Sequence, residues 1–261
     1  MSVVRLRVLV LVVTTACGRV AFDAARDAAP DDGGPDADAP MMTIDAPPSL
    51  CGTAGGLVCD GFEGTVLDPR WQLDLEQGTV ALSTVRAYRG GSSIRAQTDP
   101  ITTMTTYPRA LLLAYDGLPI TGTLHARVFV YLPTPASTMF DQLFNFADGS
   151  GQGVSMGIRD GVVVNNDYSS TQYRESATAF PLNRWTCLQM EIPADTTGTI
   201  RIFIDGTELA DAAIATGATP HPRPTHLYLG IDWPSIVTSL PPSEAWFDEL
   251  LFDSSPITCA Q

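Results

Sequence analysis

The sequence contains no lysine. All 15 of its basic residues are arginine, against 29 acidic residues, and the formal net charge is −14. A chain with this balance lacks the basic stripe that phosphate groups require, so nucleic acid is not an expected partner. Histidine is scarce as well, with only three residues, and no Cys-x-x-Cys pair occurs. These two shortages argue against a zinc or dithiol redox site.

Long hydrophobic runs are also missing. The apolar stretch at residues 6–13 is too short to span a bilayer, and Arg5 and Arg7 form a basic region around its start. This order is typical of a signal peptide. Residues 1–17 are therefore predicted to direct export.

The end of this segment, VTTAC, stops at Cys17 and resembles a bacterial lipobox, in which the cysteine is lipidated. Thr14 departs from that pattern, and an ordinary signal cleaved near Ala16 is the alternative. The resemblance implies a protein attached to the bacterial outer membrane or cell surface through lipid on Cys17 alone. Residues 18–50 are rich in Ala, Asp, Pro and Gly, and we expect a disordered tether there.

Four cysteines remain in residues 51–261, which we expect to form one domain: Cys51, Cys59, Cys187 and Cys259. An even number in an exported chain suggests two disulfides, with three possible pairings. We favour Cys51 with Cys59, which closes a short local loop, and Cys187 with Cys259, which attaches the C-terminal segment to a strand.

Helical periodicity is absent, and apolar residues alternate with polar ones instead. Residues 124–133 and 184–193 each show this period of two, which is typical of strands with one apolar face. Asp-Gly pairs at residues 160–161 and 205–206 predict hairpin turns. Many short strands in one domain imply a sandwich of two sheets.

Four segments carry a family resemblance. Residues 184–209 resemble the strand–turn–strand of laminin-G-like and pentraxin-like domains. Residues 61–71, 88–97 and 246–252 resemble the first, third and last strands of jelly-roll carbohydrate-binding modules. The resemblance implies an all-β fold, a concanavalin A-like jelly-roll β-sandwich of two antiparallel sheets.

The same resemblance implies that the first and last strands are antiparallel neighbours, which would bring Glu63 close to Asp248. In similar modules a structural Ca²⁺ lies at this position, and its ligands here would be Glu63, Asp248 and carbonyl oxygens around Gly90 and Ser92. The alternative is that both carboxylates accept backbone N–H groups or face solvent.

Catalytic patterns are weak. The compact Glu-x-Asp-x-x-Glu strand of retaining glycosidases on this fold does not occur. If the chain is a polysaccharide lyase, His125, Arg127 and Tyr131 on one strand face are the candidates, although the lyase motifs are missing. The Gly-x-Ser-x-Gly match at residues 153–157 lacks the helix that a hydrolase nucleophile needs, so we expect an ordinary strand there.

Exposed aromatic rings and nearby polar groups are the usual means of holding sugars. Tyr168 and Tyr173 flank a polar loop, and Asp232 and Trp233 end a strand, so these four are the predicted ligand-binding residues. The leading hypothesis is a non-catalytic binding domain for carbohydrate or another cell-surface ligand. A polysaccharide lyase or glycoside hydrolase of the same fold is one alternative, and a structural or adhesion lipoprotein with a protein partner is another.

Overall fold

The computed structural model describes most of the chain after residue 46. The described residues are 47–52, 58–100, 108–114, 122–133, 141–148, 150, 152–193, 197–216, 221, 223–232 and 241–260. The predictions for the signal peptide, for Cys17, for residues 18–46 of the tether and for Trp233 lie outside these ranges. Within them, no helix has both the length and the apolar character to cross a membrane.

Two antiparallel sheets contain the strands of the described residues. Sheet A has nine strands: β1 (Val58–Asp60), β3 (Gly78–Ser83), β4 (Ser93–Thr98), β6 (Leu124–Tyr131), β11 (Trp185–Ile192), β12 (Gly198–Ile204), β13 (Thr207–Glu208), β14 (Ile214–Thr216) and β16 (Glu244–Asp253). Sheet B has seven: β2 (Gln72–Glu76), β5 (Arg109–Ala114), β7 (Asp141–Ala147), β8 (Gly153–Arg159), β9 (Val162–Asp167), β10 (Gln172–Ala179) and β15 (His226–Asp232). The two short 3-10 helices of the described ranges are η1 (Leu50–Gly52) and η2 (Ala210–Ala212).

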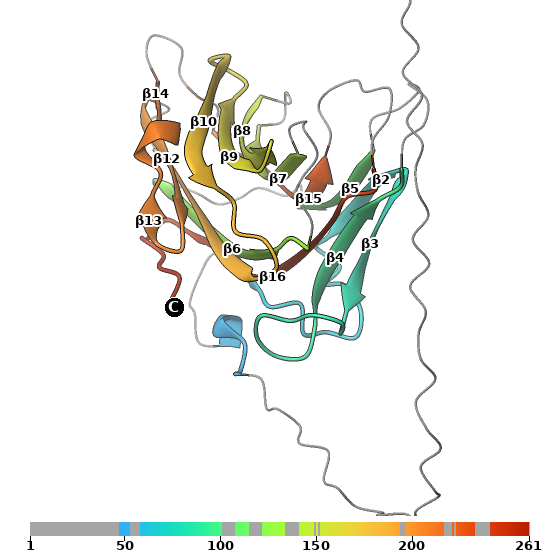
Figure 1. Cartoon of the computed structure of the whole chain (residues 1–261). Coiled ribbons are helices and arrows are strands. Elements are labelled where there is room, and N and C mark those ends of the chain that lie inside the picture. The colour runs from blue at the N-terminus through green and yellow to red at the C-terminus, as the bar shows by residue number, and fades with distance from the viewer. Residues whose placement is uncertain are drawn as a thin grey trace, which may run out of the picture. The chain divides into compact units, whose positions relative to one another are not determined.

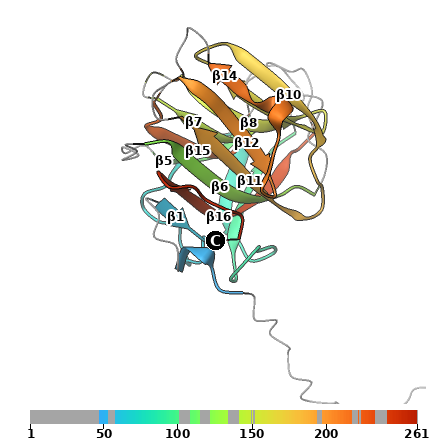
Figure 2. The ribbon, with the colours of Figure 1, turned by 90° about the vertical axis from the view of Figure 1, so that its left-hand side faces the viewer.

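The strand order in sheet A is β13-β12-β11-β6-β16-β4-β3, and in sheet B it is β10-β9-β8-β7-β15-β5-β2. Figure 1 shows sheet B on one side of the sandwich and sheet A curving along the other, with η1 and the C-terminal end beyond sheet A. Figure 2 looks more directly onto sheet A, where β16 lies beside β6. This order is that of a concanavalin A-like jelly roll, and it confirms the fold that the sequence predicts.

The core lies between the sheets, as the period of two requires. In β6 the even-numbered residues from Leu124 to Val130 belong to the apolar core, so the odd-numbered residues face outward. The same holds for β8, where Val154, Met156 and Ile158 are fully buried in the core. Alternation along single strands therefore identified the correct inner faces.

Both predicted hairpin turns are present. Asp160 and Gly161 have φ of +49° and +80° between β8 and β9, and Asp205 and Gly206 have +49° and +79° between β12 and β13. Two successive positive φ values define the type I′ turn, whose twist matches that of the flanking strands.

The first and last strands are neighbours, as the resemblance implied. β1 pairs antiparallel with β16, in a register that places Val58 opposite Phe252 and Asp60 opposite Leu250. Phe62, shortly after β1, and Phe247, within β16, both pack in the apolar core. The seam between the two ends of the domain is therefore part of sheet A.

Two disulfides hold the ends of the domain, with the pairing favoured from the sequence. Cys51 is bonded to Cys59, and Cys187 in β11 is bonded to Cys259, across sequence separations of 8 and 72 residues. Disulfides form and persist in oxidising compartments, so they indicate an exported protein.

Candidate functional site

A β-bulge in β16 sets the position of two adjacent acids. Asp248 pairs with Phe129 of β6, but the next pair is Leu251 with Arg127, so two residues oppose one. The extra residue, Glu249, has φ of +51°. Without the bulge, neighbouring side chains would point to opposite faces. Here the side chains of Asp248 and Glu249 are both fully buried and both bind segments that cover the outer face of sheet A.

Asp248 binds the loop at residues 88–89. Its Oδ2 accepts the N–H of Tyr88 at 2.7 Å and of Arg89 at 3.2 Å, and its Oδ1 accepts the N–H of Glu249 at 2.7 Å. Burial raises the pKa of Asp248 to about 8, and the charge of Glu249 adds to this, while the three N–H groups act in the opposite direction.

Glu249 binds the N-terminal segment. Its Oε2 accepts the N–H of Leu50 at 2.8 Å. Burial raises the pKa of Glu249, against the opposing effects of Ser49, the Leu50 N–H and the Arg127 charge. The two acids of β16 therefore hold surface segments in place, which is an architectural role.

The residues predicted to bind Ca²⁺ gather around one loop. Glu63 is exposed, and its Oε2 accepts the N–H of Gly91 at 2.7 Å. Ser92 Oγ donates to the carbonyl of Phe62 at 2.6 Å. Gly90 has φ of +61°, and a Cβ there would lie 2.1 Å from Glu63 Oε1. Only glycine therefore fits at residue 90 when Glu63 is in this position.

This arrangement is only a partial donor set for Ca²⁺, which takes six to eight oxygens. The loop offers N–H groups to both predicted carboxylates, at Gly91 for Glu63 and at Tyr88 and Arg89 for Asp248. Among the described residues, no group of three or more His, Cys, Asp or Glu side chains is placed to hold a metal ion.

The lyase candidates His125, Arg127 and Tyr131 share the outer face of β6, but they do not share an open groove. Arg127 is fully buried, and its Nη1 donates to the carbonyl of Thr258 at 2.9 Å. The C-terminal segment therefore lies between Arg127 and solvent. This position argues against bond breaking by these three residues.

Tyr131 belongs to a row of aromatic and arginine side chains further along the same face. The guanidinium of Arg86 lies 4.2 Å from the Tyr131 ring centroid and 4.9 Å from that of Trp246. Trp185 meets the Tyr131 ring edge-on at 5.8 Å. In cation–π contacts of this kind the ring quadrupole attracts the guanidinium electrostatically, so the Tyr131 ring is held between Arg86, Trp185 and Trp246.

Of the predicted ligand-binding residues that the structure describes, Tyr173 and Asp232 lie in strands of sheet B, and Tyr168 lies in the turn between β9 and β10. The Tyr168 hydroxyl is 3.0 Å from Ser155 Oγ. The Tyr173 hydroxyl donates to Glu175 Oε1 at 3.1 Å, and Arg159 Nη1 lies 3.4 Å from the same hydroxyl. Burial is the main reason why the pKa of Tyr173 is raised.

Asp232 ends β15, where it lies opposite Arg109 of β5. Arg109 in turn forms an ion pair with Asp74 of β2 at 3.2 Å. Asp232 therefore lies on sheet B with the two tyrosines, but in a separate row of charged residues.

The strand register brings together a set of residues that sequence reasoning missed. One row crosses five strands on the outer face of sheet B, and we call it the polar row: Tyr228 (β15), Asn145 (β7), Ser155 (β8), Asn166 (β9) and Tyr173 (β10). Ser155 is fully buried, and the other four members are partly buried. A polar residue among apolar ones in each strand was the available signal, but only the register aligns these positions.

The Gly-x-Ser-x-Gly match falls inside β8, as expected for an ordinary strand. Ser155 lies in the middle of β8, which runs into the Asp160-Gly161 hairpin without a helix. A nucleophile elbow needs a strand, a sharp turn and a helix. Ser155 is therefore a member of the polar row and has no elbow around it.

No family model and no curated protein sequence matches the chain. Among solved structures, the cellulose-induced protein Cip1 is similar with a TM-score of 0.64 at 18% identity, covering 77% of this chain and 99% of that chain. An endo-β-1,4-glucuronan lyase from the fungus Trichoderma reesei gives a TM-score of 0.57 at 15% identity, covering 73% of this chain and 93% of that chain.

A more distant similarity is to the binding domain of botulinum neurotoxin serotype C1, with a TM-score of 0.51 at 11% identity, covering 72% of this chain and 44% of that chain. At these identities the similarity defines the fold alone. The chain is thus an all-β jelly-roll sandwich of the concanavalin A-like type.

Proposed function

We propose that the outer face of sheet B binds carbohydrate without cleaving it. The observation that carries the proposal is the polar row, in which two tyrosines flank two partly buried amides across five adjacent strands, while the buried Ser155 hydroxyl supports the row from below through Tyr168. Sugars stack on aromatic rings and exchange hydrogen bonds with amides and hydroxyls. The row supplies both kinds of group in one line.

The length of the polar row favours an oligosaccharide over a single sugar. Neighbouring strands lie about 4.8 Å apart, so the four intervals from Tyr228 to Tyr173 extend over roughly 19 Å. A chain of several sugar rings laid across the strands could contact both tyrosines at once.

The charges on this face favour a neutral chain. Arg159 is in an ion pair with Glu175 at 3.3 Å, and Arg109 is in one with Asp74 at 3.2 Å. With both arginines neutralised, and with a net charge of −14 on the chain, a polyanion would be repelled at low salt.

A polysaccharide lyase or glycoside hydrolase is the alternative, and the similarity to a glucuronan lyase supports it at the level of fold. A glycan array, together with an assay for release of reducing ends or unsaturated products, separates the two. We expect binding of neutral oligosaccharides without turnover, and weaker binding of these oligosaccharides in Tyr173→Ala and Tyr228→Ala. Glu208→Ala, on an exposed position of sheet A, is the matched control. Turnover of any polysaccharide would overturn the non-catalytic proposal.

We also propose that the protein is held to a bacterial outer membrane or cell surface by lipid on Cys17. The lipobox-like sequence supports this, and the disulfides support export. The test is the membrane fraction of cells that express the wild type or Cys17→Ser. Mass spectrometry should find acyl chains on Cys17 in the wild type, and the variant should be released.

If no glycan binds and a protein co-purifies instead, a structural or adhesion role replaces carbohydrate binding.

Structural Ca²⁺ at the β1–β16 seam is a further proposal. Its support is that Glu63 and the buried Asp248 lie beside the same loop at residues 88–91. Both carboxylates accept N–H groups from this loop in the structure, so Ca²⁺ would have to replace these hydrogen bonds. Calorimetric titration with CaCl₂ should give saturable binding that Glu63→Gln and Asp248→Asn each weaken. Equal heats in wild type and both variants would reject the site.

A further inference from the structure

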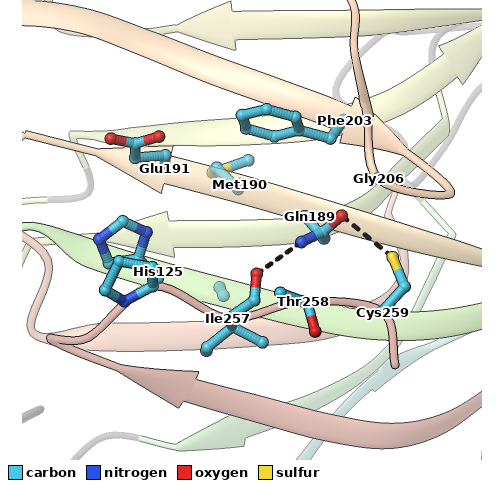
Figure 3. Close-up of a pocket in the computed structure, with 11 residues that line it drawn as sticks. His125, Gln189, Met190, Glu191, Phe203, Gly206, Ile257, Thr258 and Cys259 are labelled. Carbon is cyan, nitrogen blue, oxygen red and sulfur yellow. Dashed lines mark hydrogen bonds between the residues drawn. The ribbon is translucent and has the colours of Figure 1, made fainter. Parts of the chain in front are cut away.

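A pocket lies on the opposite sheet from the polar row. The C-terminal segment at residues 256–259 crosses the outer face of sheet A and encloses a pocket with a volume of about 350 Å³ against β6, β11 and β12. Figure 3 shows Phe203 and Glu191 along one side of it, and His125 and Ile257 along the other. Its size is within the range of small-molecule sites.

The wall of the pocket is built by cross-strand pairs. His125 lies opposite Glu191 in the β6–β11 pairing, and Gln189 lies opposite Phe203 in the β11–β12 pairing. Phe203 is partly buried and lines the pocket. An imidazole, a carboxylate and an amide therefore surround a ring in a space of small-molecule size.

The amide and the covering segment hold each other in place. Gln189 Nε2 donates to the carbonyl of Ile257 at 2.8 Å, and the Cys187–Cys259 disulfide fixes the same segment to β11. The pocket is therefore enclosed by a covalently attached segment, and its shape is set before a ligand enters. Such preorganisation lowers the entropic cost of binding.

The charged groups around the pocket disfavour an anionic ligand, but they do not require the ligand to be a cation. Glu191 lines the pocket, Asp253 lies opposite His125 on the other side, and no arginine is among the described lining residues. Arg201 Nη1 lies 3.6 Å from Glu191, which offsets the carboxylate charge from outside the pocket. Burial lowers the pKa of His125, so at neutral pH the imidazole is uncharged and can both donate and accept a hydrogen bond.

We propose that this pocket binds one neutral pyranose residue. The Phe203 ring stacks on the apolar face of the sugar, and the hydroxyls bind Glu191 and His125. An aromatic ring beside hydrogen-bond donors and acceptors suits a pyranose, which presents C–H groups to the ring and hydroxyls to the polar groups. A carboxylated or phosphorylated sugar would place its charge against Glu191, with Asp253 beyond His125, so the pocket discriminates against uronates. The site is independent of the polar row, which lies on sheet B.

The test is two-dimensional ¹H–¹⁵N NMR of the disulfide-intact domain, titrated with methyl β-D-glucopyranoside, methyl β-D-galactopyranoside and methyl α-D-mannopyranoside. Methyl β-D-glucuronide is the anionic counterpart. At least one neutral glycoside should shift the amide resonances of His125, Glu191 and Phe203. Phe203→Ala should weaken that affinity by about tenfold or more, the equivalent of about 1.4 kcal/mol of stacking, and Phe203→Tyr should retain it.

The matched control is Tyr173→Ala, which removes a ring from the polar row and should leave these shifts unchanged. Neutral glycosides that shift no pocket resonance overturn the proposal, as does equal affinity in wild type and a folded Phe203→Ala. Tighter binding of the glucuronide overturns the neutral-sugar assignment. If Phe203→Ala does not fold, Glu191→Ala on the same wall provides the comparison, with at least tenfold weaker binding expected.

Discussion

Asp248 makes the stability of the fold depend on pH in a direction opposite to that of most carboxylates. Its pKa is about 8 in the folded protein against an ordinary value of 3.8, so between these limits the folded state holds one proton more than the unfolded state. The stability that the extra proton on Asp248 contributes to the folded state is fully present below pH 3.8 and is lost as pH rises towards 8. The free energy of unfolding should fall by about 1.4 kcal/mol for each pH unit in this window.

Asp248→Asn removes the titration while keeping the shape of the side chain. Its carbonyl oxygen can still accept the Tyr88 and Arg89 N–H groups, but its NH₂ would meet the N–H of Glu249, and we expect a cost of about 1–3 kcal/mol at mildly acidic pH. The difference from wild type should shrink as pH rises, because only the wild type loses stability through this group.

The assay is urea unfolding followed by tryptophan fluorescence at a series of pH values from about 5 to 8. His125 titrates in both proteins, so its contribution cancels in the comparison of wild type and variant. Asp248→Asn also removes the charge repulsion with Glu249, so the difference between the curves reports residue 248 together with its coupling to Glu249. Asp160→Asn, at an exposed turn where φ is +49°, should follow the wild-type curve. Parallel curves for wild type and Asp248→Asn would refute the reasoning.

Gly90→Ala should destabilise the fold by more than Gly161→Ala, because both have positive φ but only the Cβ at residue 90 meets another residue, Glu63. We expect about 1 kcal/mol for residue 161 and about 1.5–2 kcal/mol for residue 90 in thermal unfolding, because the exposed Glu63 side chain can move away but then loses its bond to the Gly91 N–H, with part of the excess recovered in Gly90→Ala/Glu63→Ala; equal losses would contradict the contact. Removing the Cys187–Cys259 bond by serine substitution should cost about 4 kcal/mol, against about 2.5 kcal/mol for the Cys51–Cys59 bond, because the longer loop constrains the unfolded chain more. Chemical denaturation of the two double variants measures the order, and a reversed order would show that the loop lengths do not control it.

Local rules predicted much of the fold. The Asp-Gly turns at residues 160–161 and 205–206 depend on backbone conformation that only a few residues adopt, so the sequence reports them directly. The alternation in β6 identified its inner face because burial follows the pleat. Pairing of β1 with β16 came from the resemblance, since no local rule joins residues so far apart in the chain.

The candidate site was harder to predict because it depends on the register between strands and on which segments cover each sheet. The polar row needs five strands aligned to the residue, and a shift of one position would move Asn166 or Ser155 to the other face. Arg127 lies on the face that alternation marks as outward, yet the C-terminal segment buries it. The bulge at Glu249 arises from the register between β16 and β6, and the sequence of β16 alone does not determine that register.

Both ends of the described domain rest on the same side of the sandwich. The segment at residues 47–50 contacts Gly90 and Glu249, and the segment around Thr258 contacts Arg127, all on the outer side of sheet A (Figure 1). Anything joined to the domain through residue 47 is therefore attached there, away from the five-strand line on sheet B. Under the proposed anchoring through Cys17, Tyr173 and Tyr228 would thus lie on the sheet opposite the point of attachment.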